Sequence, residues 1–196
     1  MLEDGLKEIK MELIQAKIPL HAQVQWKLTT TRFEEWFESD LFTFNWWTML
    51  VLFIICSYLW WKLTDKSRLK EIVLYTGLVI IMIIILDEFG EELSLWVYTT
   101  DIFPIFPPIT AIDISCMPMI YSLIYQCFRT WKSFIIATIV MATVFCLVFE
   151  PIFVWSGIYI MLRWKSYYGF PIYISIALIS KAAVNKAYYV SKESLN

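Results

Sequence analysis

The sequence predicts an all-α membrane protein, a polytopic helical bundle with about five transmembrane helices and an amphipathic amino-terminal segment. Of its 196 residues, 59% are hydrophobic and 18% are aromatic, and the mean hydropathy is +0.62. Soluble domains contain about half apolar residues, so this composition indicates a single integral membrane domain. The net charge is −2 and the basic residues are scattered, which argues against a nucleic-acid partner.

The first 40 residues are expected to lie outside the hydrocarbon core. Apolar residues recur at helical spacing among charges in residues 1–20, which predicts an amphipathic helix that ends at Pro19. This helix would pack on its own domain or the membrane surface, or would dock a protein partner. A capping box at residues 31–34 predicts a second, interfacial helix that leads into the first span. No cleaved signal peptide is expected, because the segment has no apolar core.

Apolar runs between charged or proline-rich loops predict the membrane domain, residues 41–190. The first run is uncharged and long enough to cross about 30 Å of hydrocarbon at about 1.5 Å per residue. Pro151 removes a helical hydrogen bond and predicts a kink, with Trp155, Tyr159 and Trp164 near the outer interface. The expected spans are 41–61, 72–98, 108–128, 133–150 kinked at Pro151, and 168–189, before a short tail at 191–196.

The distribution of basic residues predicts the orientation. Lys62, Lys66, Arg68 and Lys70 lie in one short connection, whereas residues 99–108 contain no lysine or arginine. Because cytoplasmic loops are enriched in basic residues, the sequence predicts a multi-pass cell-membrane protein with its amino terminus outside, its carboxyl terminus in the cytoplasm and membrane lipids as partners.

Carboxyl side chains near the predicted outer ends of three spans are the main candidates for a functional site. At about 1.5 Å per residue, Asp87, Asp113 and Glu150 all reach the outer third of the bilayer. Ionised carboxylates are costly in hydrocarbon and tend to face a bundle interior. Asp87 and Glu91 share a helix face and are expected to point inward, leaving the acids at 88 and 92 near the headgroups.

Aromatic and basic side chains complete the predicted pocket. Lys181 lies near the middle of the fifth span and is expected to pair with Asp113 or Glu150. Tyr121, like Tyr125 and Gln126, can form hydrogen bonds between helices. Trp96, Tyr98, Tyr121 and Trp155 could stabilise a cation through their ring faces. The candidate pocket residues are Asp87, Glu91, Trp96, Tyr98, Asp113, Tyr121, Glu150 and Lys181, and the candidate catalytic acids are Asp87, Asp113 and Glu150.

These residues leave several functions open. Neighbouring carboxyl groups can relay protons or cations, bind a hard cation through oxygen, or act as acids on a lipid-like substrate. They can also lie at the water boundary and tether helices. No resident metal or cofactor is expected: His21 is the single histidine, and Cys56, Cys116, Cys127 and Cys146 are spread through apolar runs as packing residues.

Several segments together resemble an uncharacterised family of small multi-pass membrane proteins from spore-forming bacteria. The resemblance covers about residues 45–180 and implies a bacterial cell-membrane protein, without an assigned activity. It is carried by Trp60-Trp61-Lys62-Leu63, Asp87 with Gly90, Trp96-Val97-Tyr98, Asp113-Ile114-Ser115 with Pro118, Tyr125-Gln126, Glu150-Pro151-Ile152-Phe153 and Pro171-Ile172-Tyr173.

Trp96-Val97-Tyr98 followed by Asp113 is also faintly similar to membrane-bound lycopene and terpene cyclases, although Ile114 stands where that family carries a second acid. The sequence therefore favours a non-enzymatic protein with a carboxylate-lined pocket near the outer leaflet, which binds or passes a small ligand or cation or is a structural subunit of a membrane complex. The alternative is a membrane-embedded enzyme using acid catalysis on an isoprenoid or lipid. Two carboxyl groups in mutual contact at the end of an apolar tunnel would favour that enzyme.

Overall fold

The computed structural model describes residues 18–105 and 109–193, and the chain divides into two units, residues 1–41 and 42–196. The first unit contains α2 (Leu20–Glu35) and a π-helical turn, η1 (Trp36–Asp40). The prediction that a helix begins at the capping box is wrong, because α2 runs through it without a break. Pro19 directly precedes α2. The amphipathic helix predicted in residues 1–20 lies mostly outside the described residues.

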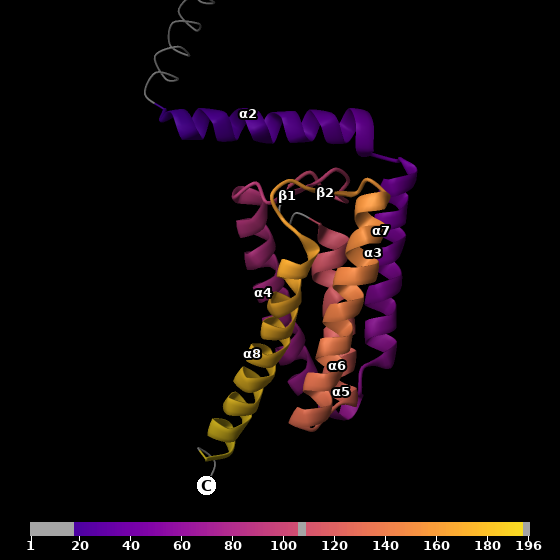
Figure 1. Ribbon diagram of the computed structural model, residues 1–196, viewed down its shortest axis with the longest axis vertical. Helices are drawn as coiled ribbons and strands as arrows, with labels where there is room; N and C mark the ends of the chain where they lie inside the picture. Colours follow the sequence, from indigo (N-terminus) through magenta and orange to yellow (C-terminus); the bar gives the residue numbers. More distant parts are fainter. Residues whose placement is uncertain (1–17, 106–108, 194–196) are drawn as a thin grey trace, which may run out of the picture. The chain divides into compact units, whose positions relative to one another are not determined.

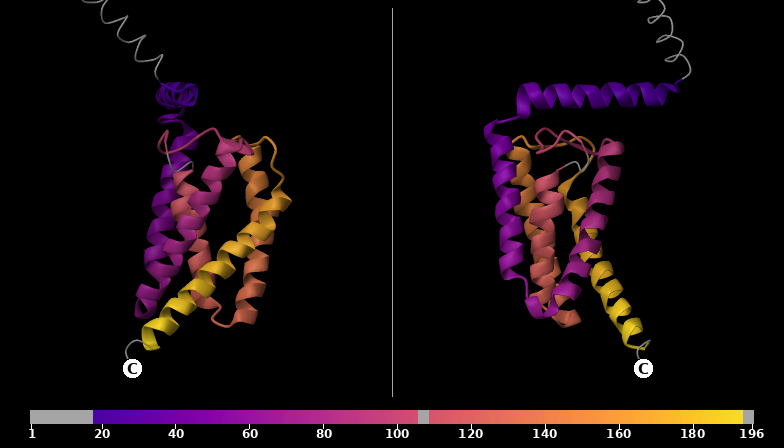
Figure 2. Two further views of the ribbon diagram at one scale, coloured as in Figure 1. Left: turned by 90° about the vertical axis from the view of Figure 1, so that its left-hand side faces the viewer. Right: turned by 180° about the vertical axis from the view of Figure 1, so that it is seen from behind.

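The second unit is a helical bundle with a small β-ribbon at one end (Figures 1 and 2). Its α-helices are α3 (Phe44–Leu63), α4 (Leu69–Glu92), α5 (Met117–Cys127), α6 (Trp131–Val144), α7 (Glu150–Trp155) and α8 (Ser166–Glu193). A 3₁₀ turn, η2 (Lys66–Arg68), precedes α4, and two π-helical turns, η3 (Ala111–Cys116) and η4 (Phe145–Phe149), precede α5 and α7. The ribbon pairs β1 (Trp96–Tyr98) with β2 (Tyr159–Met161) in antiparallel register.

Four helical segments in the described part are long and apolar enough to cross a membrane: Phe44–Leu63, Lys66–Glu92, Trp131–Trp155 and Ser166–Ser191. The chain is therefore an all-α protein of multi-pass type. η3 and α5, expected as the third span, contain six and eleven residues. At about 1.5 Å per residue they cover about 25 Å, slightly less than a hydrocarbon core of about 30 Å.

The two ends of the bundle are built differently (Figure 1). One end carries the α3–α4 and α5–α6 turns, and we call it the basic end. The other end carries β1 and β2, and we call it the ribbon end. At the basic end the Gln126 side chain donates to the Leu63 carbonyl at 2.9 Å and accepts from the Asp65 amide at 3.0 Å. The predicted interhelical role of Gln126 is confirmed, because it fastens α5 to the turn between α3 and α4.

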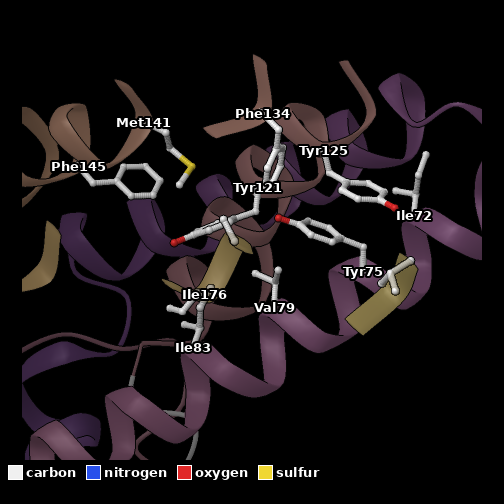
Figure 3. Packing of buried hydrophobic residues seen from close by; sticks show 12 residues of the cluster. Ile72, Tyr75, Val79, Ile83, Tyr121, Tyr125, Phe134, Met141, Phe145 and Ile176 are labelled. Carbon is white, nitrogen blue, oxygen red and sulfur yellow. The ribbon is translucent and has the colours of Figure 1, made fainter. Parts of the chain in front are cut away.

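A tyrosine-rich core fills the half of the bundle near the basic end (Figure 3). The rings of Tyr75 and Tyr125 stack with their centroids 4.1 Å apart, and Phe134 packs edge-on against both. The Tyr125 hydroxyl donates to Glu71 Oε1 at 2.6 Å, and Arg68 donates to both oxygens of the same carboxylate. Each Glu71 oxygen therefore has a donor, while Arg68 Nη1 has no partner among the described residues.

Lys181 belongs to the basic half, and its predicted pairing with Asp113 or Glu150 is wrong. Its ammonium donates to the carbonyls of Phe128 and Arg129, both at 3.1 Å, and lies 4.0 Å from the centroid of the Phe134 ring. These carbonyls follow α5, where a helix has no further amides to occupy them. The lysine on α8 therefore caps α5 and joins both helices to α6.

At the ribbon end, α4 stops at Glu92, so the predicted span of 72–98 is too long. The Leu95 amide donates to the Gly90 carbonyl at 2.9 Å and the Ser94 amide to Glu91 at 2.8 Å, with Ser94 at φ 52°. This is the pattern of a Schellman turn with Ser94 at the left-handed position, which glycine usually occupies. The chain reverses there, and β1 runs back over the last turns of α4.

Each of the two π-helical turns in the bundle stands directly before a helix whose second residue is a proline. The Met117 amide bonds to Ile112 and the Glu150 amide to Phe145, each five residues back. Pro118 and Pro151 have no amide hydrogen to continue a regular helical ladder, and a widened turn is one way in which a helix adapts. A π turn that ends at Phe149 thus lies directly before the segment where the sequence predicts a kink at Pro151.

Candidate functional site

A cavity of about 380 Å³ lies in the half of the bundle near the ribbon. Its wall is mostly apolar and aromatic, and three carboxyl side chains interrupt it: Asp87 from α4, Asp113 from η3 and Glu150 from α7. Leu86, Phe89 and Leu93 line the cavity and are also exposed on the surface of α4. The cavity therefore reaches a surface that lipid chains would cover in a membrane.

The Asp87 carboxyl is held by two residues of β1. Its Oδ1 accepts from the indole Nε1 of Trp96 at 3.1 Å and from the Tyr98 hydroxyl at 2.7 Å. Alternate residues of a strand point to the same face, so a tryptophan and a tyrosine two positions apart can both reach one carboxyl group. The Schellman turn supplies the reversal that brings this strand face over Asp87.

Gly90 makes the approach of β1 possible. A Cβ atom on Gly90 would lie 1.9 Å from the Trp96 ring, so the indole rests directly on the backbone of α4. The Trp96 ring is fixed from its other side by Trp164, whose centroid is 4.9 Å away. The Leu95 carbonyl accepts from the amide of Trp164 and from the two amides before it, which positions this second tryptophan.

The Asp113 side chain lies close to the Asp87 carboxyl group, and the Oδ2 atom of each has no partner among the described residues. Only 2% of Asp113 and 9% of Asp87 is exposed. A carboxylate has no donor, so the two carboxyl groups can bond to each other only when a proton lies between them. Ser115 fixes η3 against α3 through Ser57 at 2.9 Å and the Phe53 carbonyl at 3.0 Å, which holds Asp113 at that position.

Glu150 lines another part of the same cavity. Its Oε1 accepts from the Tyr173 hydroxyl of α8 at 2.6 Å, while Oε2 has no partner among the described residues and the residue is 8% exposed. Ser166 lies near this carboxyl group, but its hydroxyl is directed to the Met161 sulfur at 3.9 Å. Glu150 therefore presents one buried, unpaired oxygen.

Two phenols of the ribbon lie among these acids. The Tyr98 and Tyr159 rings stack with centroids 5.3 Å apart. Burial raises the pKa of Tyr98, and the nearby Asp87 and Asp113 carboxylates raise it further. Burial, Glu150 and Asp87 likewise raise the pKa of Tyr159. Both phenols therefore stay neutral at physiological pH, and Tyr159 lies within electrostatic reach of both Glu150 and Asp87.

The structure brings five of the eight predicted pocket residues to the cavity wall: Asp87, Trp96, Tyr98, Asp113 and Glu150. Glu91, Tyr121 and Lys181 are not part of that wall. Tyr121 donates to the Tyr173 carbonyl at 2.9 Å, which is the interhelical role predicted for it. Trp155, expected near a cationic centre, is 88% exposed. Glu88 and Glu92 are exposed on α4, as predicted.

Sequence reasoning missed Tyr173, Trp164 and Gly169 as wall residues and placed Tyr159 only at the interface. Tyr159 and Trp164 belong to an apolar run that looks like the end of a span, and only the strand pairing turns them inward. The role of Gly169 could have been predicted from the sequence. A glycine four residues before a tyrosine on one helix face leaves room for a side chain from another helix, here that of Glu150, whose Oε1 would lie 3.0 Å from a Cβ atom at that position.

No group of three or more His, Cys, Asp or Glu side chains that could hold a metal ion occurs in the described ranges. Asp87, Asp113 and Glu150 thus do not form such a group. No family model, curated protein or solved structure matches this chain. The geometry of the cavity is thus the basis for any functional assignment.

Proposed function

We propose that the protein binds an apolar, lipid-like molecule in the cavity, with a polar group of that molecule directed to the Asp87–Asp113 pair. The observation that carries this proposal is the burial of two neighbouring carboxyl groups in the wall of an otherwise mostly apolar cavity of about 380 Å³. Ligand pockets of this size class are typically apolar, with a few convergent polar groups that fix orientation. The wall residues exposed on α4 support entry from the bilayer.

Passage of a cation or proton is less well supported. Between Asp87 and the basic end, α4 turns Ile72, Val79 and Ile83 into the core, each at most 6% exposed. They pack into the tyrosine-rich cluster seen in Figure 3. A small ion would have to cross this packed layer, where neutral hydroxyl groups such as those of Tyr75 and Thr138 are the available oxygen ligands, at high desolvation cost. A purely structural role is also less well supported, because the carboxyl groups do not point to bulk water.

Acid catalysis on an isoprenoid or lipid is the second candidate, and the two neighbouring buried carboxyl groups of Asp87 and Asp113 favour it. A carboxylic acid in contact with a carboxylate can donate its proton to a substrate double bond or oxygen while its partner keeps the remaining charge close. Trp96, Tyr98 and Tyr159 lie beside the pair, and their ring faces can stabilise positive charge that develops on the substrate. The fainter cyclase resemblance points to the same chemistry.

The binding proposal is tested with a photoreactive long-chain alcohol and the protein in lipid nanodiscs. Crosslinks located by mass spectrometry should fall on cavity-wall residues, and Ile120→Trp, which places a larger side chain in the wall, should reduce crosslinking at least tenfold. Ile136→Trp adds the same bulk to the exposed face of α6 and should change nothing. Crosslinks confined to outward-facing residues in both variants would exclude the cavity as the binding site.

The catalytic candidate has its own test. Linear isoprenoids are incubated with the protein, and isomers of unchanged mass are sought by chromatography. Asp113→Asn keeps the shape of the pair but removes the acid, so it should abolish product formation, while Glu88→Gln on the exposed face should leave it intact. Binding without any product in the native protein would leave the first proposal standing and remove the second.

A further inference from the structure

Glu150 is the cavity acid that the proposed binding mode does not use. It lies at the start of α7 and contacts α8, whereas the Asp87–Asp113 pair joins α4 to η3. The π turn η4 immediately before it widens the helix, and π turns recur at functional sites because they redirect side chains. Burying a carboxylate is costly unless its oxygens are bonded, so the free Oε2 points to a missing partner.

Glu150 Oε2 stays without a partner although hydroxyl groups lie near the carboxyl group. On the α8 side, the backbone of Gly169 approaches so closely that a Cβ atom there would lie 3.0 Å from Glu150 Oε1 and 3.0 Å from the Tyr173 ring. Tyr173 uses its hydroxyl on Oε1, and the Ser166 hydroxyl is directed to the Met161 sulfur. The wall residues next to Glu150 in the sequence, Phe149 and Phe153, carry no polar side-chain atoms.

The cavity therefore has two polar poles separated by an apolar wall. The Asp87–Asp113 pair forms one pole and Glu150 the other, and among the described residues the three acids form no group that could hold a metal ion. Tyr159 lies within electrostatic reach of both Glu150 and Asp87. A molecule with a single polar group can satisfy one pole only.

We infer that the ligand is a two-headed amphiphile, an apolar chain with hydrogen-bond donors at two separated positions. One donor, a hydroxyl or an ammonium group, binds at the Asp87–Asp113 pole, and the second binds Glu150 Oε2. This inference rests on the proposed binding function and names the chemical class of its ligand. A buried carboxylate that gains a donor recovers a charge-assisted hydrogen bond, which is stronger than a neutral one.

The test compares linear α,ω-diols of increasing length with 1-alkanols of the same carbon number. Each compound competes with the photoreactive alcohol for crosslinking in nanodiscs. For the native protein, one diol length should compete at least tenfold better than the matched alkanol, because only one spacing fits both poles. Equal competition by diols and alkanols at every length would overturn the inference while leaving the binding proposal in place.

Two substitutions assign the effect to Glu150. Glu150→Met removes both acceptor oxygens with little change in shape. In this variant the diol should compete about as well as the matched alkanol, and alkanol binding should persist. Glu88→Met removes an exposed acid on α4 and should retain the preference. Loss of diol and alkanol binding together in Glu150→Met, with Glu88→Met unaffected, would mean that Glu150 only supports the fold and would overturn the inference. Failure of every alcohol to compete in the native protein would remove the binding proposal and this inference with it.

Discussion

The two halves of the bundle use the same kinds of polar side chain in opposite ways. Near the basic end, Glu71 receives donors on both oxygens from Arg68 and Tyr125, and Lys181 is matched by two carbonyls. Near the ribbon, the acids face a cavity and Glu150 keeps an unpaired oxygen. A tyrosine that donates a hydrogen bond to a carboxylate is therefore not in itself evidence of a functional site. What distinguishes the ribbon half is unfilled volume beside unsatisfied acceptors.

The largest expected effect on stability comes from the basic half. Lys181→Met should lower the free energy of unfolding by about 3 kcal/mol, because two carbonyls lose a charged donor in a buried setting. Lys186→Met, an exposed position on the same helix, should change it by less than about 0.5 kcal/mol. Unfolding in mixed micelles measures both. Alcohol crosslinking in the cavity should survive in Lys181→Met at temperatures where that variant is folded, and its loss there would contradict the division into halves.

The next effect is specific to the ribbon half. Gly90→Ala places a methyl group into the Trp96 ring. This overpacking should lower the free energy of unfolding by about 2 kcal/mol. Because it displaces the hydrogen-bond partners of Asp87, it should also reduce crosslinking of the photoreactive alcohol at least fivefold. Gly77→Ala is the control on the same helix, since nothing lies within 4 Å of its added Cβ atom. That control should be neutral or stabilising by up to about 1 kcal/mol. Equal behaviour of the two variants would contradict the close packing of Trp96 on α4.

A matched pair of hydroxyl deletions compares the halves directly. Tyr125→Phe and Tyr173→Phe each remove a 2.6 Å hydrogen bond to a glutamate. Tyr125→Phe should cost about 1.5 kcal/mol of stability and leave binding unchanged, because Glu71 lies outside the cavity wall. Tyr173→Phe should cost less than Tyr125→Phe when a diol is present, since the ligand can occupy Glu150 in place of the phenol. Thermal unfolding with and without the diol measures this difference.

The smallest effects are pH responses of opposite sign at the two ends. Burial raises the pKa of Asp101, beyond β1, to about 8. The folded state therefore binds this proton more tightly than the unfolded state, and its contribution to stability is lost as the pH rises from about 4 through 8. A hydrogen bond from the Ser67 side chain lowers the pKa of the exposed Asp65 at the basic end, so its contribution is lost as the pH falls below about 4.

Melting temperatures from pH 3 to 9 measure these two contributions. The difference between the native protein and Asp101→Asn should shrink as the pH rises, and that between the native protein and Asp65→Asn should shrink as the pH falls below the usual carboxyl pKa. The same pH trend in both variants would show that the two carboxyl groups do not differ in environment.

The sequence predicts much of this organisation because membrane spans follow from uncharged apolar runs. It also predicts that Asp87, Asp113 and Glu150 reach a common depth, since the flanking charges set where each helix begins. It cannot predict β1 and β2. Three apolar residues after a span look like more of the same span, and periodicity does not separate a short strand from a helix end. The partners of Lys181 were missed because they are backbone carbonyls, which no side-chain pattern reveals.

The two strands of the ribbon come from distant parts of the chain, one directly after α4 and the other between α7 and α8. During synthesis, Asp87 and its tryptophan and tyrosine partners leave the ribosome well before Tyr159 is translated. The cover over the acids can therefore form only after α7 has been made, so the ribbon end matures late and depends on the carboxyl-terminal third of the chain. Early truncations would leave these acids open to the translocon and to lipid.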